Sequence, residues 1–297
     1  MSTLKATTRY EYGGDEFVFV ELSEEMSLEA LFKVLVITQN LEKKQLPGII
    51  DICPGNASYM IRIDPDMIHP DDLIRELKEI ERNMDGTDNI KINSRLIEIP
   101  ALFDDPWTHE ALMKFRKNHQ DPNATDLEYA ARINGFDSKE KFIDHFVSYP
   151  FIVSMLGFVP SLPFYFQLVD RKKQIEVPKY VTPRTFTPAR AIGFGGAFGS
   201  IYPVDGAGGY QLLGIVAPEI LDTEQKLSDF KDSMVFFRQN DIMQFRNVTM
   251  DEYKEIRSEV ESGTFKYNMK EISYSLKEII ENPEEFAKRV RGVLKND

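Results

Sequence analysis

The stretch AIGFGGAFGSIYPVDGAGGYQLLG, residues 191–214, decides the fold of most of this chain. It sets short apolar segments between two glycine clusters, GFGGAFG at 193–199 and GGYQLLG at 208–214. Neither cluster has the GxGxxG spacing with a following helix, or the Lys-Ser/Thr of a P-loop, that brings backbone N–H groups to a phosphate. Such glycines more often permit sharp bends or close backbone approach. We therefore interpret the stretch as strands and tight turns of a barrel.

The same pattern of short apolar segments separated by prolines and glycines extends from residue 150 to residue 247. This pattern is typical of a compact β-domain, and we expect a β-barrel. Residues 107–148 before it have helical spacing in three segments; Gly135 is placed to stop the second, and Ser138 to cap the third. We therefore predict a second domain, residues 101–248, made of a helical linker and a barrel.

The first hundred residues follow a different order of strands and helices. The expected strands are EFVFVEL (16–22), PGIIDI (47–52), SYMIRID (58–64) and RLIEIP (95–100), and the expected helices are 27–44 and 69–84. This βαββαβ order predicts a small antiparallel sheet with two helices on one face. We assign it to a first domain, residues 1–100.

The last segment, residues 249–297, is charged and helical by pattern. MDEYKEIRSEVESG ends on Gly263, and NPEEFAKRVRGVLKND has Pro283 near a helix start. We interpret this tail as a solvated packing appendage. The expected fold class is α+β, with a small sheet-and-helix domain, a β-barrel domain and a helical C-terminal tail.

Composition restricts the possible partners and the compartment. The 297 residues fit two domains, and 48 acidic against 36 basic residues give a formal net charge of -12, which repels nucleic acids and anionic membranes. The N-terminus has no apolar signal core, and no stretch approaches the roughly 18 apolar residues of a membrane span. The only cysteine, Cys53, excludes an intrachain disulfide. We expect a cytoplasmic protein without nucleic-acid or membrane partners, and we expect Cys53 to be a small buried residue rather than a nucleophile.

His145 and Tyr149 are four residues apart, which places both side chains on one face of a helix if the helix extends that far. Two interpretations are open: a structural hydrogen-bonding pair, or a pair that transfers protons or binds a carboxylate. The other histidines, His69, His109 and His119, lie at helix starts or in a polar loop. None has a zinc-ligand spacing with the cysteine, so we expect no metal site.

The segment VPKYVTPRTFTP, residues 177–188, combines Lys179 and Arg184 with three prolines. In so acidic a chain, these cations either form a local anion site or lie on the surface paired with carboxylates. Asp241 stands at the edge of an apolar run, as a turn former or as a substrate acceptor. There is no G-x-S-x-G elbow and no clear Ser-His-Asp constellation, so serine-hydrolase chemistry has little support.

Five stretches between residues 10 and 245 follow the order and spacing of a known family. They are YEYGGDEFVFVEL, PGIIDICPGNASYMIRIDP, HFVSYPFIVSMLGFVPSLPF, PKYVTPRTFTPARAIGFGGAFGSIYPVDGAGGYQLLG and FFRQNDIMQF. On these stretches the chain resembles the family of allophanate hydrolase subunit 1. That family includes subdomains C and D of the carboxyltransferase domain of urea carboxylase, the B component of 5-oxoprolinase and the sporulation kinase inhibitor KipI. The fourth stretch and the helical tail look closer to the urea carboxylase branch.

The resemblance implies a ferredoxin-like first domain and a cyclophilin-like barrel. It also implies a homologue of subunit 2 as partner, together with a biotin carboxylase and a biotin carrier that delivers carboxybiotin to a joint cleft. The chain would be an enzyme subunit, inactive alone, that helps to move carboxylate to a small amide-like or carbonyl acceptor. Two other family functions stay open: the B component of an ATP-dependent lactam hydrolase of the 5-oxoprolinase type, or a KipI-like inhibitor of a histidine kinase.

The resemblance also implies site residues. The family motif is matched by Gly208, Gly209, Tyr210 and Gln211, which would form a barrel turn at the cleft wall, where glycines let a ligand approach backbone N–H groups. By the same resemblance Lys179 and Arg184 would lie near the carboxylate, Glu29 and Asp241 would hold acceptor N–H groups, and His145 and Tyr149 would support proton movement.

Two departures from the family pattern qualify this expectation. Family members commonly have Pro before the paired glycines and Gly-Arg-Thr after them, whereas this chain has Ala207 and then Gly214-Ile215-Val216, so one possible anion-binding arginine is missing. The urea carboxylase branch tends to have Asn where this chain has Glu29. An ionised carboxylate only accepts hydrogen bonds, which argues against urea itself as the acceptor.

Overall fold

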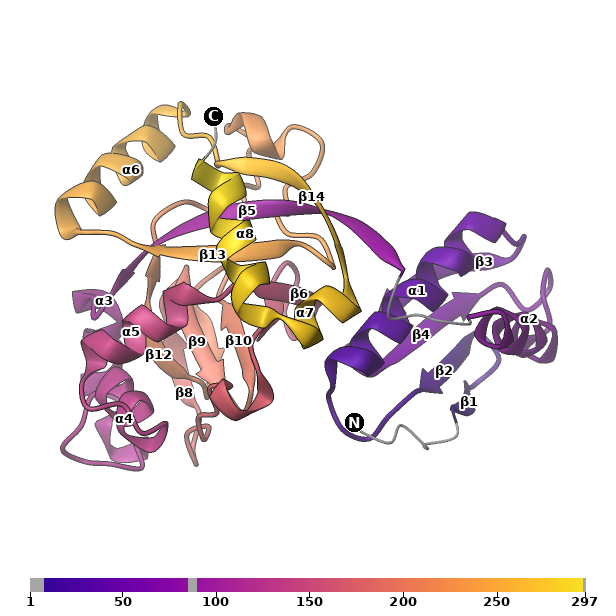
Figure 1. Cartoon of the computed structure of the whole chain (residues 1–297), viewed down its shortest axis with the longest axis horizontal. Coiled ribbons are helices and arrows are strands. Elements are labelled where there is room, and N and C mark those ends of the chain that lie inside the picture. Colours follow the sequence, from indigo (N-terminus) through magenta and orange to yellow (C-terminus); the bar gives the residue numbers. More distant parts are fainter. Residues whose placement is uncertain (1–7, 85–89, 296–297) are drawn as a thin grey trace. The chain divides into compact units, whose positions relative to one another are not determined.

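The computed structural model describes residues 8–84 and 90–295. It contains two compact units, the first comprising Met1–Ile92 with Tyr274–Glu278 and the second comprising Asn93–Ser273 with Ile279–Asp297. The ribbon in Figure 1 labels most of the helices and strands of each unit.

The first unit is a small antiparallel sheet with two helices. Its elements are β1 (Arg9–Gly13), β2 (Phe17–Glu21), α1 (Leu28–Lys44), β3 (Ile49–Pro54), β4 (Ser58–Ile63) and α2 (Pro70–Arg82). The strands lie in the order β1-β2-β4-β3. Ser27 caps α1 by accepting the Ala30 N–H at 3.1 Å, and Pro70 opens α2 where a missing N–H costs nothing.

Both helices cover the same face of this sheet. Alternate residues of β2 and β4 are buried, among them Val18, Val20, Tyr59 and Ile61, and one apolar cluster joins them to α1 and α2. A strand that buries every second residue has one face in the core and one outside it. The predicted small antiparallel sheet with two helices on one face is therefore confirmed.

The second unit is built on a β-barrel. Its strands are β5 (Lys91–Phe103), β6 (Phe151–Leu156), β7 (Pro163–Gln167), β9 (Ala191–Gly195), β10 (Phe198–Ile201), β12 (Gln211–Val216) and β13 (Ile242–Asn247). Within the described ranges these seven strands follow the order β12-β9-β10-β7-β6-β13-β5, and pairing of β12 with β5 closes the circle. A second, two-stranded sheet joins β8 (Arg184–Thr187) to β11 (Gly206–Gly208). The predicted α+β class with a barrel is confirmed.

The strand expected at residues 95–100 forms, but it does not complete the small sheet. It belongs to β5, which pairs in parallel with β13 from Leu96↔Ile242 to Ala101↔Asn247. The physical reason is burial: Leu96, Ile97 and Ile99 are all fully buried, as in a strand covered on both faces, whereas β2 and β4 of the small sheet bury alternate residues.

Three helices, α3 (Pro106–Lys114), α4 (Asp126–Ile133) and α5 (Lys139–Ser148), follow β5 as predicted. Ser138 caps α5 by accepting the Lys141 N–H, and Gly135 has a φ of 76° just after α4, the left-handed conformation that ends helices. Both cap assignments are confirmed.

The tail contains α6 (Met250–Ser262), β14 (Met269–Ser275), α7 (Leu276–Glu281) and α8 (Pro283–Lys295). Gly263 ends α6 with a φ of 76°, as predicted. The tail differs from the predicted solvated packing appendage in two respects, a strand among the helices and deeper burial. β14 extends the large sheet beside β5, and Tyr253, Phe265 and Tyr267 lie inside the barrel-side core, with Tyr267 stacked on Phe236 at 3.9 Å between ring centroids.

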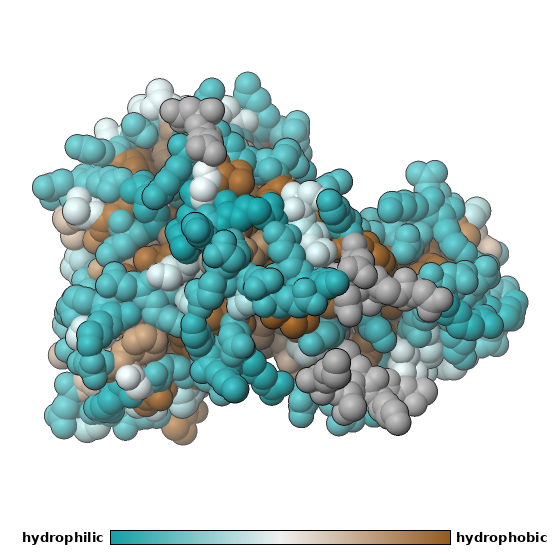
Figure 2. Space-filling model, in the orientation of Figure 1, coloured by the Kyte–Doolittle hydropathy of each residue, from teal (hydrophilic) through white to brown (hydrophobic). Residues whose placement is uncertain are grey.

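The surface drawn in Figure 2 is largely hydrophilic, with apolar side chains in separate patches, in line with the charge of -12. Among residues 8–84 and 90–295, no helix is both long enough and apolar enough to cross a bilayer.

Candidate functional site

The two glycine clusters lie on neighbouring strands of the barrel. GFGGAFG forms the hairpin between β9 and β10, and Gly196, at a φ of 63°, makes its turn. Gly208 ends β11, and β12 begins three residues later and pairs with β9. The predicted use of these glycines in tight turns and close approach is confirmed.

Tyrosine rings fill the space beside several of these glycines. A β-carbon on Gly195 would overlap the ring of Tyr210, one on Gly199 would overlap Tyr165, and one on Gly208 would overlap the hydroxyl end of Tyr202. In contrast, the nearest atoms to such a carbon on Gly209 belong to Pro183, at 3.5 Å or more. Gly208 is therefore packed by the protein itself, and Gly209 is the half-buried glycine of the pair.

Four predicted site residues meet at this turn and form what we call the Lys179 cluster. They are Lys179, Gly209, Tyr210 and Gln211. The Nζ of exposed Lys179 lies 5.1 Å from the centre of the Tyr210 ring, a cation–π arrangement. The N–H of Tyr180 donates to Gly209 O at 2.8 Å, and Gln211 Nε2 donates to Pro178 O at 3.0 Å. Burial raises the pKa of Tyr210 to about 12, so its hydroxyl stays protonated at neutral pH.

Arg184 contacts the Lys179 cluster but is fully buried. Its Nη2 donates to Tyr210 O at 2.7 Å, and its guanidinium lies 4.6 Å from the centre of the Tyr180 ring. Its Nε and Nη1 have no hydrogen-bond partner in the described part of the chain. Because the side chain has no exposed surface, Arg184 supports the Tyr210 turn from inside and does not reach solvent.

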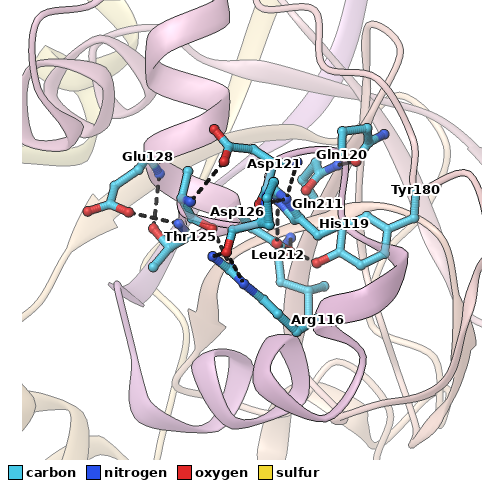
Figure 3. A network of polar contacts seen from close by, with 12 residues as sticks. Arg116, His119, Gln120, Asp121, Thr125, Asp126, Glu128, Tyr180, Gln211 and Leu212 are labelled. Atoms are coloured by element: carbon cyan, nitrogen blue, oxygen red, sulfur yellow. Dashed lines mark hydrogen bonds and ion pairs between the residues drawn. The ribbon is translucent and has the colours of Figure 1, made fainter.

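A buried polar network supports the cluster from the α4 side (Figure 3). Asp126 accepts the Leu212 N–H at 2.6 Å and a short hydrogen bond from the Tyr180 hydroxyl. Burial and the Asp126 charge raise the pKa of Tyr180 well above its ordinary value. The Asp126 carboxylate at the start of α4 thus fixes Tyr180, which follows Lys179, and Leu212, which follows Gln211.

His119 completes this network. Its Nδ1 lies 2.9 Å from the Asp121 N–H and 2.6 Å from Asp121 O; we assign the ring proton to Nε2, because Nε2 faces Asp126 Oδ1 at 3.2 Å. No hydrogen bond joins these two atoms in the described part of the chain, although they lie close together. Tyr129 and Tyr180 enclose the ring edge-on, with centroids 5.2 Å away in each case.

Gln120 links the loop before α4 to the turn. Its Oε1 accepts from Gln211 Nε2 at 3.0 Å, and its Nε2 makes a short hydrogen bond to Lys179 O. The Oε1 of buried Gln211 has no partner in the described residues. Lys179 and Gln211 are therefore held by backbone and amide groups, which leaves the Lys179 ammonium at the surface.

His145 and Tyr149 are brought together, with ring centroids 5.3 Å apart, although α5 ends at Ser148 and Tyr149 is already extended. The Tyr149 hydroxyl donates to Glu284 Oε1 at 2.6 Å, and His145 Nε2 lies 2.9 Å from Lys173 O. Burial lowers the pKa of His145 and raises that of Tyr149. The pair faces the tail helix α8, and none of its hydrogen bonds reaches the Lys179 cluster.

Asp241 is also occupied by its own chain. It is 2% exposed, pairs with Arg95 through both oxygens and accepts the Arg238 N–H at 2.7 Å. Burial raises its pKa, and Arg95 opposes that rise. Such a carboxylate has little acceptor capacity left for a ligand.

Glu29 and Cys53 belong to the first unit. Glu29 is half-buried in the first turn of α1, where a carboxylate favours the helix dipole. Cys53 is exposed on β3 and donates to Asp51 Oδ2 at 3.3 Å, so the expectation that it is buried is wrong. It lies on the outer face of a sheet that is covered on one side only, and burial of part of the thiol together with Asp51 raises its pKa, which disfavours the thiolate.

His119, Gln120 and Asp126 were not predicted as site residues. They lie in NHQDPNATD, a polar stretch with the composition of an exposed loop. One local signal was available, since Thr125 and Glu128 form a capping box that starts α4 and places Asp126 in its first turn. Nothing in the spacing indicates that Asp126 reaches β12, 86 positions later.

Known proteins are similar to this chain along most of its length. The chain is 26% identical over 284 residues to a urea amidolyase of Saccharomyces cerevisiae, covering 91% of this chain and 15% of that protein. It is 26% identical over 263 residues to the B component of 5-oxoprolinase from Bacillus subtilis, covering 85% of this chain and 99% of that component. The chain thus spans less than a quarter of the first relative and nearly all of the second.

Solved structures agree on the fold. The urea amidolyase of K. lactis matches 100% of this chain with a TM-score of 0.82 and 24% identity, over 18% of that chain. The urea carboxylase of Kluyveromyces lactis matches equally fully, with a TM-score of 0.81, over 26% of its chain. Relatives of this kind are either a subunit or a part of a larger chain. Residues 8–229 match the family described as carboxyltransferase domain, subdomain C and D, and the protein belongs to that family.

Proposed function

We propose that this protein is one half of a biotin-dependent carboxyltransferase, inactive alone, that acts in the cytoplasm with a subunit 2 homologue. A biotin carboxylase and a biotin carrier would complete the system, and a small amide-like or carbonyl compound would accept the carboxyl group. The observation that carries the proposal is the match of the whole chain, tail included, to the fold of urea carboxylase at a TM-score of 0.81.

The residues of the turn suit such a role. A carboxylated biotin bears one negative charge, and Lys179 offers an exposed ammonium whose contact in the described residues is the Tyr210 ring and not a carboxylate. Gly209 leaves room beside its backbone. When bound, carboxybiotin supplies the carboxyl group to be transferred. Lys179 would orient that group, and Tyr210 and Gly209 would limit water beside it.

The buried residues would act indirectly. Asp126 and Arg184 hold Tyr180, Leu212 and Tyr210 in place, and a fixed donor set costs little reorganisation during reaction. We propose that His145 and Tyr149 anchor α8 and that Asp241 stabilises the start of β13, because their partners are Glu284, Lys173 and Arg95. Glu29 is kept as a proposed acceptor-binding residue.

The test is reconstitution with the subunit 2 homologue, a biotinylated carrier and a biotin carboxylase, followed by assays of carboxyl transfer to urea, guanidine, ketones and lactams. We expect transfer to one acceptor class, and Lys179→Met should lower kcat/KM by about ten- to a hundredfold. Lys172→Met, which removes an exposed lysine of the short 3-10 helix η3 (Arg171–Lys173), is the matched control. Absence of transfer to every acceptor, or equal activity of the two variants, would contradict the proposal.

A second function has a specific observation in its favour. The chain covers 99% of the B component of 5-oxoprolinase, which is a separate protein of similar length. We therefore also test ATP-dependent opening of 5-oxoproline, in the presence of the C component of that enzyme and a LamB-like partner. Activity there without any biotinylated component would replace the first proposal with this one.

A further inference from the structure

A cavity of about 570 Å³ lies in the second unit, between α6 and the barrel. None of its lining residues belongs to the Lys179 cluster or its supporting network. The volume falls within the range of small-molecule sites, roughly 300–1,000 Å³. Its wall on α6 includes Met250, Tyr253, Lys254 and Arg257, which lie on one face because they recur at helical spacing. The cavity therefore presents an apolar end and a basic end along a single helix.

The apolar end is aromatic. Trp107, at the start of α3, packs against Tyr253 with ring centroids 5.1 Å apart and planes tilted by 35°. Trp107 is 40% exposed, so part of the indole stays open to the cavity, and Ile215 of β12 adds an aliphatic surface. Exposed aromatic surface of this kind favours a planar apolar group.

The basic end of the cavity carries an excess of positive charge. Arg190 Nε lies 3.6 Å and Arg257 Nη1 2.7 Å from the same oxygen of Glu219, so two guanidinium groups share one carboxylate. Their side chains are only 16% and 21% exposed, which weakens screening by solvent. Arg257 uses Nη1 for both of its hydrogen bonds, and its Nε and Nη2 have no partner in the described ranges.

Other charges around the cavity do not cancel this excess. Among the described residues, Lys254 pairs only with Asp251, at 3.8 Å, and both side chains are largely solvated. The lining carboxylates, Asp205 and Glu261, are exposed, and Asp205 already accepts the Ala189 N–H at 2.7 Å. Charges in contact with water act weakly over distance, so the half-buried guanidinium groups dominate.

The cavity wall also includes a residue in an unusual conformation. Arg190 has a φ of 67°, in the left-handed region that residues other than glycine rarely adopt. Its Nη1 donates to Tyr253 OH at 2.9 Å and to Val216 O at 3.1 Å, which ties the β8–β9 connection to α6 and β12. Such positions concentrate at functional sites.

We infer that this cavity binds a small planar carboxylate, with its ring against Trp107 and Tyr253 and its carboxylate at Arg257 and Lys254. The site goes beyond the proposed carboxyl transfer, since it shares no residue with the Lys179 cluster. Arg257 offers two donors to an anion, and a charge-assisted hydrogen bond in a half-buried place is the strong kind.

The experiment uses the only tryptophan of the chain, Trp107, as the reporter. The purified full chain is titrated with benzoate up to ~10 mM, and Trp107 fluorescence is recorded, with benzamide and acetate as neutral and non-aromatic controls. We expect a saturable change with benzoate, and at least about tenfold weaker binding of benzamide and acetate. A saturable change of equal strength with benzamide, or none with benzoate, would overturn the inference.

Variants locate the binding. Lys254→Met, at an exposed position, and Arg257→Lys, which keeps the charge beside Glu219, should each weaken benzoate binding, and Arg257→Met should weaken it by about tenfold. Lys288→Met, at an exposed position of α8, is the matched control and should bind benzoate as the unmodified chain does. Unchanged affinity in both Lys254→Met and Arg257→Lys would show that the benzoate lies elsewhere. Because no carboxyl transfer is measured, the result is independent of the proposed function.

Discussion

At the scale of single residues, the glycines of this barrel create space for tyrosine rings. Gly195, Gly199 and Gly208 each stand where a side chain would overlap Tyr210, Tyr165 or Tyr202. The sequence could predict that these glycines allow close approach, but it could not identify what approaches. The reason is that a glycine pattern records only missing side-chain volume, whereas the ring that fills it comes from another segment of the chain.

A substitution at Gly208 tests this packing. Gly208→Ala should destabilise the protein by about 1–3 kcal/mol, because the new methyl group overlaps the Tyr202 hydroxyl in a packed core. Gly206→Ala, on the same strand with open space around it, should change stability by less than about 0.5 kcal/mol. Urea unfolding of both variants measures the difference. Adding Tyr202→Phe to Gly208→Ala should recover part of the loss, and no recovery would contradict the assigned contact.

At the scale of elements, helix caps and strand spacing were predictable, whereas the partners of edge elements were not. Ser138, Gly135, Gly263 and Pro70 all act at helix ends as their local sequence predicts. β14 was not predicted, because its sequence MKEISYS lies between the charged helix α6 and the helices α7 and α8. The alternation of apolar and polar residues in this strand is short, and the helical pattern around it is the stronger signal. The junction of α5 with α8 could not be predicted, since Tyr149 and Glu284 are 135 positions apart.

That junction should make stability sensitive to mild acid. Burial lowers the pKa of His145 in the folded protein, so the unfolded chain takes up a proton first as the pH falls. The stabilising contribution of neutral His145 is complete above about pH 6.5 and is lost as the pH falls from there through the lowered folded pKa. His145→Gln should therefore lose less stability than the unmodified chain in this window.

Equilibrium urea unfolding at several pH values between about 7.5 and 5 measures this difference. His109→Gln, which removes an exposed histidine of α3, is the control and should follow the unmodified chain. An identical loss of stability in His145→Gln and His109→Gln would show that His145 is not responsible.

At the scale of the whole molecule, the tail is part of the second unit's core. Phe265 is buried against Tyr267 with ring centroids 5.1 Å apart, and both belong to the cluster that fills the barrel side. The charged composition concealed this, because the apolar residues of the tail are a minority, most of which are buried. The pattern predicted helices correctly and exposure wrongly.

Phe265→Ala should cost about 3–5 kcal/mol of stability, the usual cost of emptying a buried aromatic position. Phe158→Ala removes the same side chain at a position that is 71% exposed, and should change stability by less than about 0.5 kcal/mol. Thermal and denaturant unfolding distinguish the two. A similar loss of stability in both variants would show that the tail is not part of the core.

The pairing of β5 with β13 has a consequence for biosynthesis. The two strands join residues 146 positions apart, whereas the hairpins of the first unit join near neighbours in the chain. Contacts between distant positions form slowly, because the chain must lose the entropy of closing a long loop before the contact can stabilise it. On the ribosome, the amino-terminal sheet can therefore assemble early, while β5 lacks its partner strands until β12, β13 and β14 have emerged in turn. During that interval β5 is the segment most in need of a chaperone.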